Sequence, residues 1–128
     1  MFVAAVDDLF FSARIKETAR QVGAPIQIVT AAKLKGTLEE RLTRGAVEAV
    51  ILDLNAYGAV GVIQALKADQ RTRHVPIIGF ASHVAKDLIA AARNAGCDQV
   101  LARSAFTARL PELLTSPCHS MKPPERNL

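Results

Sequence analysis

Three carboxylates directly follow two apolar runs of the sequence. Asp7 and Asp8 end the run 2–6, and Asp53 ends the run 49–52. If both runs are buried strands lying side by side, the three carboxylates meet at the sheet edge where an open α/β sheet places its ligand crevice. Converging carboxylates repel one another unless protons or a hard cation neutralise them. Mg²⁺ is the cation expected to bind here, because it takes few protein oxygens as ligands, keeps several waters and commonly bridges carboxylates to phosphate.

A basic side chain, Arg103, follows the short predicted strand 99–102 and so belongs to the same edge. A cation beside several carboxylates suits a site that binds or transfers a phosphoryl group. The alternative is structural: Asp7 and Asp8 cap a following helix, and Asp53 ends a strand in water. Each residue alone favours the structural alternative, whereas the acids and Arg103 together favour the phosphoryl site.

Five apolar stretches, each followed by a helical pattern, must position these residues. Strands are expected at 2–6, 26–30, 49–55, 75–80 and 99–102, and helices after Asp8, from Thr37 to Gly45, around Val62 to Leu66, from Lys86 to Ala95 and from Thr107 onward. The run 49–52 lacks polar alternation, which is typical of a strand buried on both faces of a parallel sheet. Right-handed crossovers make this order an α/β three-layer sandwich around a five-stranded parallel sheet.

Local signals set several of these boundaries. The segment 37–40 matches a capping box, and Thr107 is a good N-cap that would place Pro111 in the first turn of the last helix. Pro76 is tolerable near the start of its strand, where a ladder donor can be spared. The partial alternation of 26–30 predicts a strand nearer the sheet edge.

Length and composition fit one domain. Half of the 128 residues are apolar and 22% are charged, as in an ordinary globular domain with a single core. The domain is expected to occupy residues 1–115, and the proline-containing segment 116–128 is expected to be a flexible tail. No apolar run approaches the ~20 residues that span a bilayer, and no basic region precedes the first apolar segment. We therefore expect a cytoplasmic protein without membrane contact.

Charge and cysteines exclude two further classes of site. The formal net charge is +4, but the basic residues are dispersed and lack interleaved aromatics, which favours a solvated surface over direct nucleic-acid binding. Cys97 and Cys118 lie far apart without metal-ligand spacing, so neither a disulfide framework nor a zinc site is expected. Cys97 is expected to be a small buried residue, and His74 and His83 to be solvated in loops.

The order and spacing of several fragments resemble the response-regulator receiver family over roughly residues 2–115. The fragments are Val6-Asp7-Asp8, Ile51-Leu52-Asp53-Leu54-Asn55, Val75-Pro76-Ile77-Ile78, Phe80-Ala81-Ser82-His83-Val84 and 95–103. Gly61 also stands eight residues after Asp53, as the family's loop glycine does. The resemblance implies the flavodoxin-like (βα)5 receiver fold.

The same resemblance implies that Asp53 accepts a phosphoryl group from a phosphohistidine on a sensor histidine kinase or phosphotransfer protein. Asp8, Asp53 and the backbone carbonyl of Asn55 would hold Mg²⁺, with Asp7 completing an acidic pair beside Asp8, and Arg103 would contact the phosphoryl group. Such a protein is not an enzyme, and it signals through contacts with a downstream protein partner. Its oligomeric state stays open.

The chain departs from the family's pattern on the side that would respond to phosphorylation. Ala81 falls where the family has a Ser or Thr hydroxyl, although Ser82 is adjacent. Val100 stands where an aromatic switch residue often lies. Arg103 replaces the usual Lys; it keeps the charge but not the geometry. The acceptor half of the site is thus intact, whereas the half that relays the signal is largely missing.

Two other interpretations remain open on the sequence. The chain could be a pseudo-receiver, a protein-interaction module that keeps the acids for structure and does not switch by phosphorylation. A small flavin- or nucleotide-binding enzyme has less support, because there is no G-x-G-x-x-G and no P-loop. Tyr57, where the family has a loop Pro, either contacts a partner or covers the acidic residues.

Overall fold

A five-stranded parallel sheet forms the middle layer of the protein. The computed structural model describes residues 1–82 and 85–115, so the predictions for His83 and the tail 116–128 lie outside the described residues. The strands are β1 (Phe2–Ala5), β2 (Ile26–Val29), β3 (Ala49–Asp53), β4 (Ile77–Ala81) and β5 (Gln99–Ala102). Their order is β2-β1-β3-β4-β5, with every neighbouring pair parallel. This is the flavodoxin-like order, which reverses direction between β1 and β3.

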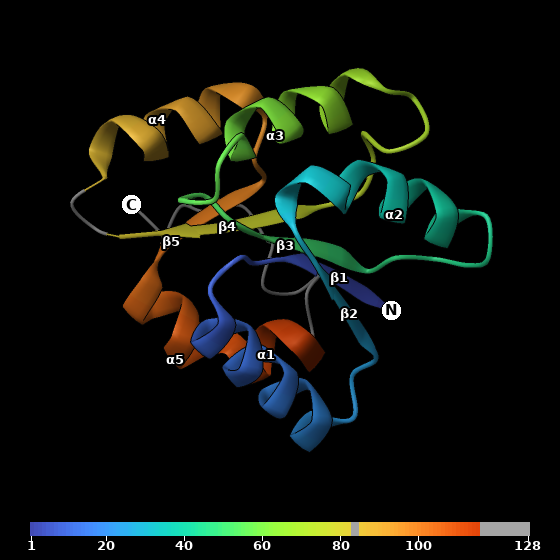
Figure 1. Ribbon diagram of the computed structural model, residues 1–128, viewed down its shortest axis with the longest axis vertical. Helices are drawn as coiled ribbons and strands as arrows, with labels where there is room; N and C mark the ends of the chain where they lie inside the picture. The colour runs from blue at the N-terminus through green and yellow to red at the C-terminus, as the bar shows by residue number, and fades with distance from the viewer. Residues whose placement is uncertain (83–84, 116–128) are drawn as a thin grey trace.

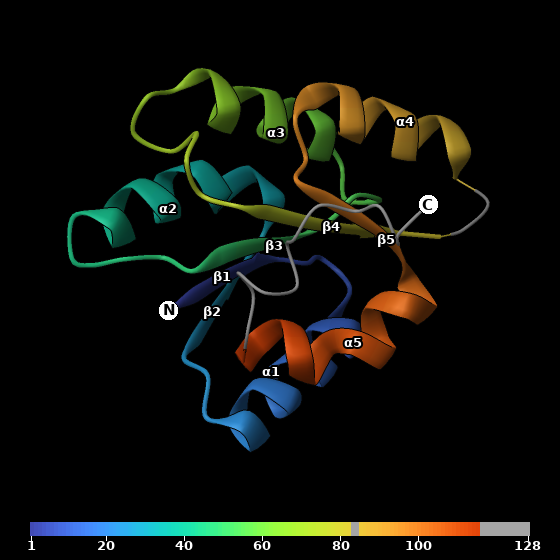
Figure 2. The same ribbon diagram turned by 180° about the vertical axis from the view of Figure 1, so that it is seen from behind.

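Helices cover both faces of this sheet (Figures 1 and 2). The helices are α1 (Leu9–Val22), α2 (Leu34–Leu42), α3 (Ala59–Ala68), α4 (Lys86–Ala95) and α5 (Arg103–Thr115), with a short 3₁₀ turn, η1 (Ala31–Lys33), before α2. In both views α1 and α5 lie on one face, and α2, α3 and α4 lie on the other. The predicted three-layer sandwich is confirmed, and β2 is an edge strand as its partial alternation indicated. Among the described residues, no helix has the length and apolar character needed to cross a membrane.

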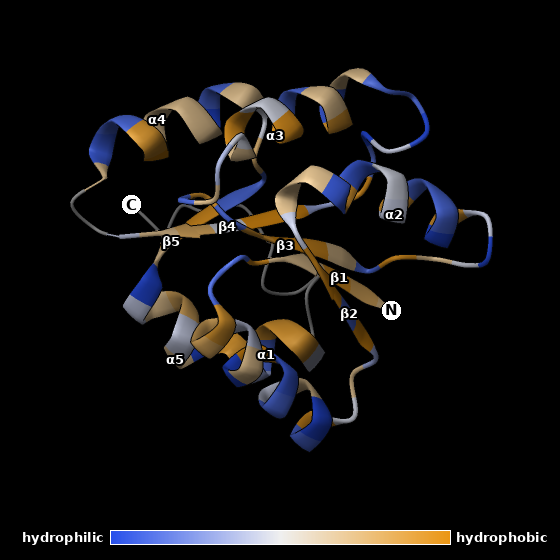
Figure 3. Ribbon diagram, in the orientation of Figure 1, coloured by the Kyte–Doolittle hydropathy of each residue, from blue (hydrophilic) through white to orange (hydrophobic). Residues whose placement is uncertain are grey.

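The core consists of two hydrophobic clusters, one on each face of the sheet. Successive residues of a strand point to opposite faces, so Val50 and Leu52 pack toward α2, α3 and α4, whereas Ala49 and Ile51 pack toward α1 and α5. All four side chains are completely buried. Figure 3 shows hydrophobic residues along the central strands. The uninterrupted apolar run of β3 therefore contributes side chains to both hydrophobic clusters, as predicted for a strand covered on both faces.

The second helix begins earlier than its capping signal predicted. The expected N-cap Thr37 lies inside α2, and the actual N-cap residue, Lys33, makes no side-chain capping bond. Leu34 and Leu38 stand four residues apart and are both fully buried. Burial of this pair against the sheet outweighs the local signal and extends the helix toward its N-terminus.

The last helix and the fourth strand also differ from prediction. α5 begins at Arg103 rather than after Thr107, because Phe106 and Leu110 both pack into the core. Pro111 consequently lies inside α5 instead of in its first turn. β4 runs from Ile77 to Ala81, one residue beyond the predicted end, and Pro76 precedes it. Ala81 is therefore a strand residue at the same edge as Asp53.

Candidate functional site

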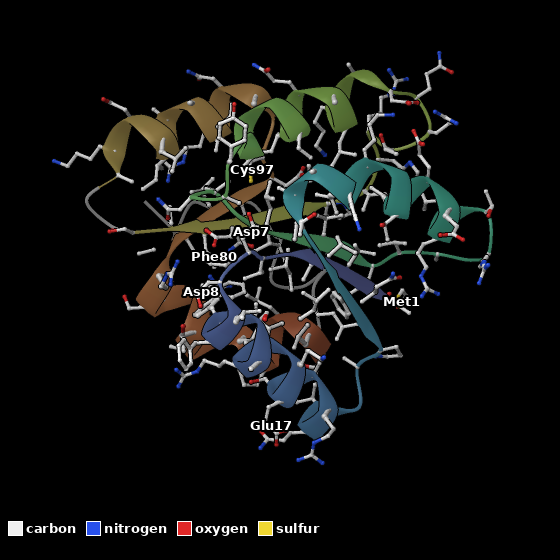
Figure 4. All side chains as sticks on the ribbon, viewed as in Figure 1. Met1, Asp7, Asp8, Glu17, Phe80 and Cys97 are labelled. Carbon is white, nitrogen blue, oxygen red and sulfur yellow. The ribbon has the colours of Figure 1, made fainter. Side chains whose placement is uncertain are left out.

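The carboxyl ends of β1 and β3 bring the predicted acids to one edge of the sheet. Ala5 pairs with Leu52 in the parallel ladder, and the next residues of each strand lead to the acids. Asp7 and Asp8 follow β1, and Asp53 is the last residue of β3. Figure 4 shows Asp7, Asp8 and Phe80 at this edge. We call the three acids Asp7, Asp8 and Asp53 the acidic pocket.

Asp53 is the buried member of the acidic pocket. Its side chain is only 6% exposed, which contradicts the structural alternative of a strand end in water. One carboxylate oxygen, Oδ1, accepts a hydrogen bond of 3.0 Å from the backbone N–H of Asn55. Burial raises the pKa of Asp53 above its ordinary value; the Asn55 N–H and the charge of Arg103 counteract that effect, and Asp7 and Asp8 add to it. The charged form of Asp53 is thus less favourable here than in water.

Asp8 serves both as the cap of a helix and as an ion-pair partner of Arg103. It is the N-cap of α1, and its Oδ1 accepts a 3.1 Å hydrogen bond from the N–H of Phe11. Its second oxygen, Oδ2, lies 3.7 Å from Nη1 of Arg103. The predicted capping and pocket roles therefore coexist in one residue, because each uses a different oxygen.

Arg103 lies between the two acids, immediately after β5. Its Nη2 is 3.9 Å from Oδ2 of Asp53, in addition to the contact with Asp8. Its Cζ lies 4.7 Å from the ring centre of Phe11 and 5.6 Å from that of Phe80. Phe80 stacks on Phe106 at 4.5 Å between ring centres. We call these three rings, Phe11, Phe80 and Phe106, the aromatic floor; cation–π attraction helps to hold the guanidinium over it.

The aromatic floor is a functional feature that the sequence analysis missed. The sequence assigned Phe11 no role beyond its place in the first helix, and Phe80 none beyond the strand 75–80 and the segment that follows it. The three rings come from α1, β4 and α5, so no spacing in the sequence indicates that they meet. The available signal was the large ring at position 80, next to a strand end already expected to lie at the site.

Of the predicted relay positions, Ala81 ends β4 and Ser82 follows it, at the edge of the sheet that carries Asp53, whereas Val100 lies within β5. Ala81 is completely buried at the end of β4. The backbone N–H of Ser82 donates to Oδ1 of Asn55 over 3.4 Å. Val100 is half-buried and packs toward the α3 and α4 side of the sheet, away from the aromatic floor. A surface depression of about 380 Å³ is lined by Ser82, Ala102, Arg103 and Ser104.

Several other singled-out residues can now be placed. Tyr57 is 97% exposed, so it does not cover the acidic pocket; its contact with a partner stays a prediction. Gly61 lies inside α3 rather than in a loop, and Gly58, with φ of 79°, makes the turn before that helix. Cys97 is buried as predicted, and burial raises the pKa of its thiol to about 11. His74 is exposed in a turn.

The donor chemistry of the pocket fits a hard cation, since carboxylate oxygens are what Mg²⁺ prefers. Among residues 1–82 and 85–115, however, no group of three or more His, Cys, Asp or Glu side chains is arranged to hold a metal ion. Asp8 and Asp53 each have one oxygen bonded to a backbone N–H and the other facing Arg103. Metal ligation by these residues and by the carbonyl of Asn55 stays a prediction.

The fold matches solved structures, although no family model and no curated protein matches the sequence. Response regulator RPA3017 in red light signaling of R. palustris is 23% identical with a TM-score of 0.69, covering 92% of this chain and 90% of that chain. Chemotaxis response regulator CheY4 of Vibrio cholerae is 13% identical with a TM-score of 0.71, covering 94% and 96%. The Mn(2+)-bound form of response regulator Rcp1 is 11% identical with a TM-score of 0.71, covering 90% and 91%.

These likenesses extend over nine-tenths of the chain and define its fold class. The protein has the CheY-like fold of response-regulator receiver domains, as the sequence fragments predicted. Because the identities are below 25%, the likeness concerns the fold, and the function must be argued from the acidic pocket itself.

Proposed function

We propose that the chain is a receiver domain of two-component phosphorelay signalling and accepts a phosphoryl group on Asp53. The observation that carries the proposal is the placement of Asp53 in this fold. Asp53 ends the central strand β3, at the edge where doubly wound sheets bind ligands. The N–H of Asn55 donates to Oδ1 of Asp53 and leaves Oδ2 for the reaction. That oxygen faces a cationic side chain, Arg103.

The reaction would be a displacement at phosphorus. The free oxygen of Asp53 attacks the phosphoryl group of a phosphohistidine, a P–O bond forms, the P–N bond breaks, and the released imidazole nitrogen takes up a proton from water. The protein is the acceptor in this transfer and not an enzyme that turns over a substrate. The guanidinium of Arg103 would pair with the added phosphoryl oxygens, and the depression beside Ser82 and Ser104 offers them room.

A divalent cation would assist at the same place. Asp8, Asp53 and the backbone carbonyl of Asn55 are the proposed ligands, with Asp7 supporting them; bound Mg²⁺ would neutralise charge on the transferring phosphoryl group. The Mn(2+)-bound form of Rcp1 supports divalent-cation binding for a protein of this fold. The chain's own part is to supply carboxylate oxygens from two adjacent strand ends.

The proposed donor is a sensor histidine kinase or phosphotransfer protein in the cytoplasm, and the output is a contact with a downstream protein. Large hydrophobic side chains are exposed around the edge that carries Asp53: Leu9 and Phe10 at the start of α1, and Tyr57 in the loop after β3. Exposed aromatic and aliphatic side chains of this kind favour protein contacts. They support a protein partner at the same edge as the acceptor.

The proposal is tested by exposing the protein to acetyl phosphate and Mg²⁺ and measuring the intact mass. We expect one added phosphoryl group on the parent protein and none on Asp53→Asn, because an amide is a poor nucleophile. Asp87→Asn, which removes an exposed acid of α4, is the matched control and should label like the parent. Full labelling of Asp53→Asn would assign the acceptor to another acid, with Asp7 and Asp8 the next to test.

A pseudo-receiver is the second candidate, and a specific observation favours it. Arg103 already neutralises part of the pocket, and Ala81 offers no hydroxyl to follow a phosphoryl group. In that case the acids stabilise the fold, and the protein binds its partners without phosphorylation. The same mass measurement decides: a parent protein that takes up no phosphoryl group under conditions that label an ordinary receiver domain is a pseudo-receiver.

A further inference from the structure

We infer that the free edge of β2, together with a groove between this strand and α1, binds an extended acidic segment of a protein partner. The segment would pair with β2 as an added strand, and its carboxylates would meet the cations that flank β2. The groove lies at the amino end of β2, whereas the acidic pocket lies at the carboxyl ends of β1 and β3. The inference is therefore independent of the proposed phosphorylation of Asp53.

The first step is the backbone of β2, the outermost strand of the sheet, which pairs with β1 on one side only (Figure 1). On that side, the carbonyl of Val29 accepts a hydrogen bond of 3.1 Å from the N–H of Val6. The backbone groups of successive strand residues point in opposite directions, so those of Ile26 and Ile28 point to the free edge. Such N–H and C=O groups are the template on which an extended peptide adds a strand.

The second step is how little protects this edge. Charged side chains, prolines within the strand and covering elements are the usual means of preventing edge pairing. None of residues 26–29 is charged, and Pro25 precedes the strand without interrupting it. The protection that remains is the length of β2, only four residues, which suits pairing with a short segment.

The third step is a surface depression of about 520 Å³ beside the edge, which we call the β2 groove. Its apolar lining includes Ala13 of α1, Ala24 and Ile26, and its cations are Lys16 and Arg20 of α1. A side chain that points from an added strand toward α1 would enter this groove. Because alternate side chains of a strand share a face, the segment is expected to carry an apolar residue at every second position.

The fourth step is charge, because cationic side chains flank β2 on both faces of the sheet. The acid of the β2 groove, Glu17, is already paired with Arg20, with Oε2 and Nη2 2.5 Å apart. On the other face, Nε of Arg41 donates to Oε1 of Gln27 at 2.6 Å. Neither Lys16 nor Arg41 makes an ion pair with another described residue. Each face of the edge strand thus offers a cation to the carboxylates of a partner.

A second copy of the chain suits this edge less well than an acidic segment does. Two β2 strands paired about a two-fold axis would place α1 of one copy beside α1 of the other. Lys16 and Arg20 would then face the same residues of the second copy, and Arg41 would do so on the opposite face of the sheet. Like charges that face each other across paired strands disfavour the pairing.

The experiment uses the parent protein and a short peptide of alternating glutamate and valine, blocked at both ends. Amide chemical shifts and hydrogen exchange are followed through a titration. We expect the amides of Ile26 and Ile28 to shift and to exchange more slowly, because each gains an acceptor. The amides of Gln27 and Val29 already bond to β1 and should keep their exchange rates. The same peptide with lysine in place of glutamate should bind roughly tenfold more weakly.

A charge reversal beside the groove tests the electrostatic part. Lys16→Glu should bind the acidic peptide roughly tenfold more weakly than the parent does. Lys86→Glu, at the exposed first residue of α4, is the matched control and should bind like the parent. Unchanged amides at Ile26 and Ile28, equal binding of the two peptides, or equal affinity of Lys16→Glu and the parent would each overturn the inference.

Sedimentation of the protein without peptide tests the other occupant of the edge. We expect a monomer whose Ile26 and Ile28 amides exchange freely. A dimer in which these two amides are protected would assign the edge to a second copy of the chain and overturn the inference. Neither a phosphodonor nor Mg²⁺ is present in these measurements, so a failure to label Asp53 does not affect their outcome.

Discussion

Leu54 fills the space above Gly79: a Cβ atom placed on Gly79 would lie 2.9 Å from one Cδ of Leu54 and 3.0 Å from the other. Leu54 is itself only 1% exposed and donates its backbone N–H to the carbonyl of Phe80 at 2.9 Å. It stands between Asp53 and Asn55 in the sequence. The close approach of β4 to this residue therefore fixes the backbone that carries the proposed acceptor.

Replacement of Gly79 by alanine should destabilise the protein and disturb the site. Overpacking a filled core typically costs about 1–3 kcal/mol, and the buried side chain of Leu54 would have to shift to admit the new methyl group. The measurement is urea unfolding, together with phosphoryl uptake from acetyl phosphate. Gly61→Ala is the control, since nothing lies within 4 Å of a Cβ at that helical position, and it should stabilise α3 by about 0.5–1 kcal/mol. Equal stability of the two variants would contradict this account.

Asp53→Asn should raise the free energy of unfolding at neutral pH, by an amount on the order of 1 kcal/mol. Burial raises the pKa of Asp53 in the folded state above the ordinary 3.8, so the unfolded state loses its proton first as the pH rises. Stability is therefore lost on going from below pH 3.8 up through the folded pKa, and the ionised group costs stability above it.

The check is urea unfolding of both proteins at neutral and at acid pH. The advantage of Asp53→Asn should shrink as the pH falls below the folded pKa, where the parent's carboxyl is neutral in both states. Asp7→Asn, at an exposed position in the same pocket, should give a smaller effect. An Asp53→Asn variant that is less stable than the parent at pH 7 would show that attraction to Arg103 outweighs the cost of burying the charge of Asp53.

Arg103→Lys should lower stability slightly and slow phosphoryl uptake without abolishing it. Lysine keeps the positive charge that would pair with phosphoryl oxygens, but it loses the stacking over Phe11 and Phe80, worth about 0.5–1 kcal/mol at a partly exposed site. The two readouts are the urea midpoint and the rate of mass increase with acetyl phosphate. Complete loss of labelling in a folded Arg103→Lys protein would assign the guanidinium a role that charge alone does not fill.

The face formed by α4 and β5 should change little when a phosphoryl mimic binds. Ala81 has no hydroxyl to move toward the added group, and Val100 has no aromatic ring to reorient. Amide spectra with and without beryllofluoride should therefore show shifts near Asp8 and Asp53 and only small shifts over 86–102. Large shifts across α4 and β5 would mean that another residue transmits the change.

The central strand and its acid could be predicted because local sequence and tertiary packing agree there. The run that ends at Asp53 is aliphatic on both faces, and both faces are covered. Helix starts were less predictable. Thr37 and Thr107 are good capping residues, yet burial of Leu34 and Phe106 contributes more free energy than a cap and moves each start toward the N-terminus.

The contacts within the pocket could not be predicted for a different reason. Arg103, Phe11 and Phe80 belong to segments far apart in the sequence, and only the order of the strands brings them together. The sequence places Arg103 at the correct edge but does not specify the rings beneath it. Spacing indicates which strand ends meet, and it gives no information on which side chains of α1, β4 and α5 come together there.

Because Asp8 caps α1, the charges around Asp8 affect how often the first turn of that helix frays. The amide of Phe11 is held by the same carboxylate that faces Arg103. Anything that draws the charge of Asp8 toward a new cation weakens that bond, and the first turn of α1 should open more often. The rate of hydrogen exchange at the Phe11 amide would then show whether a cation is bound at Asp8, without any label on the protein.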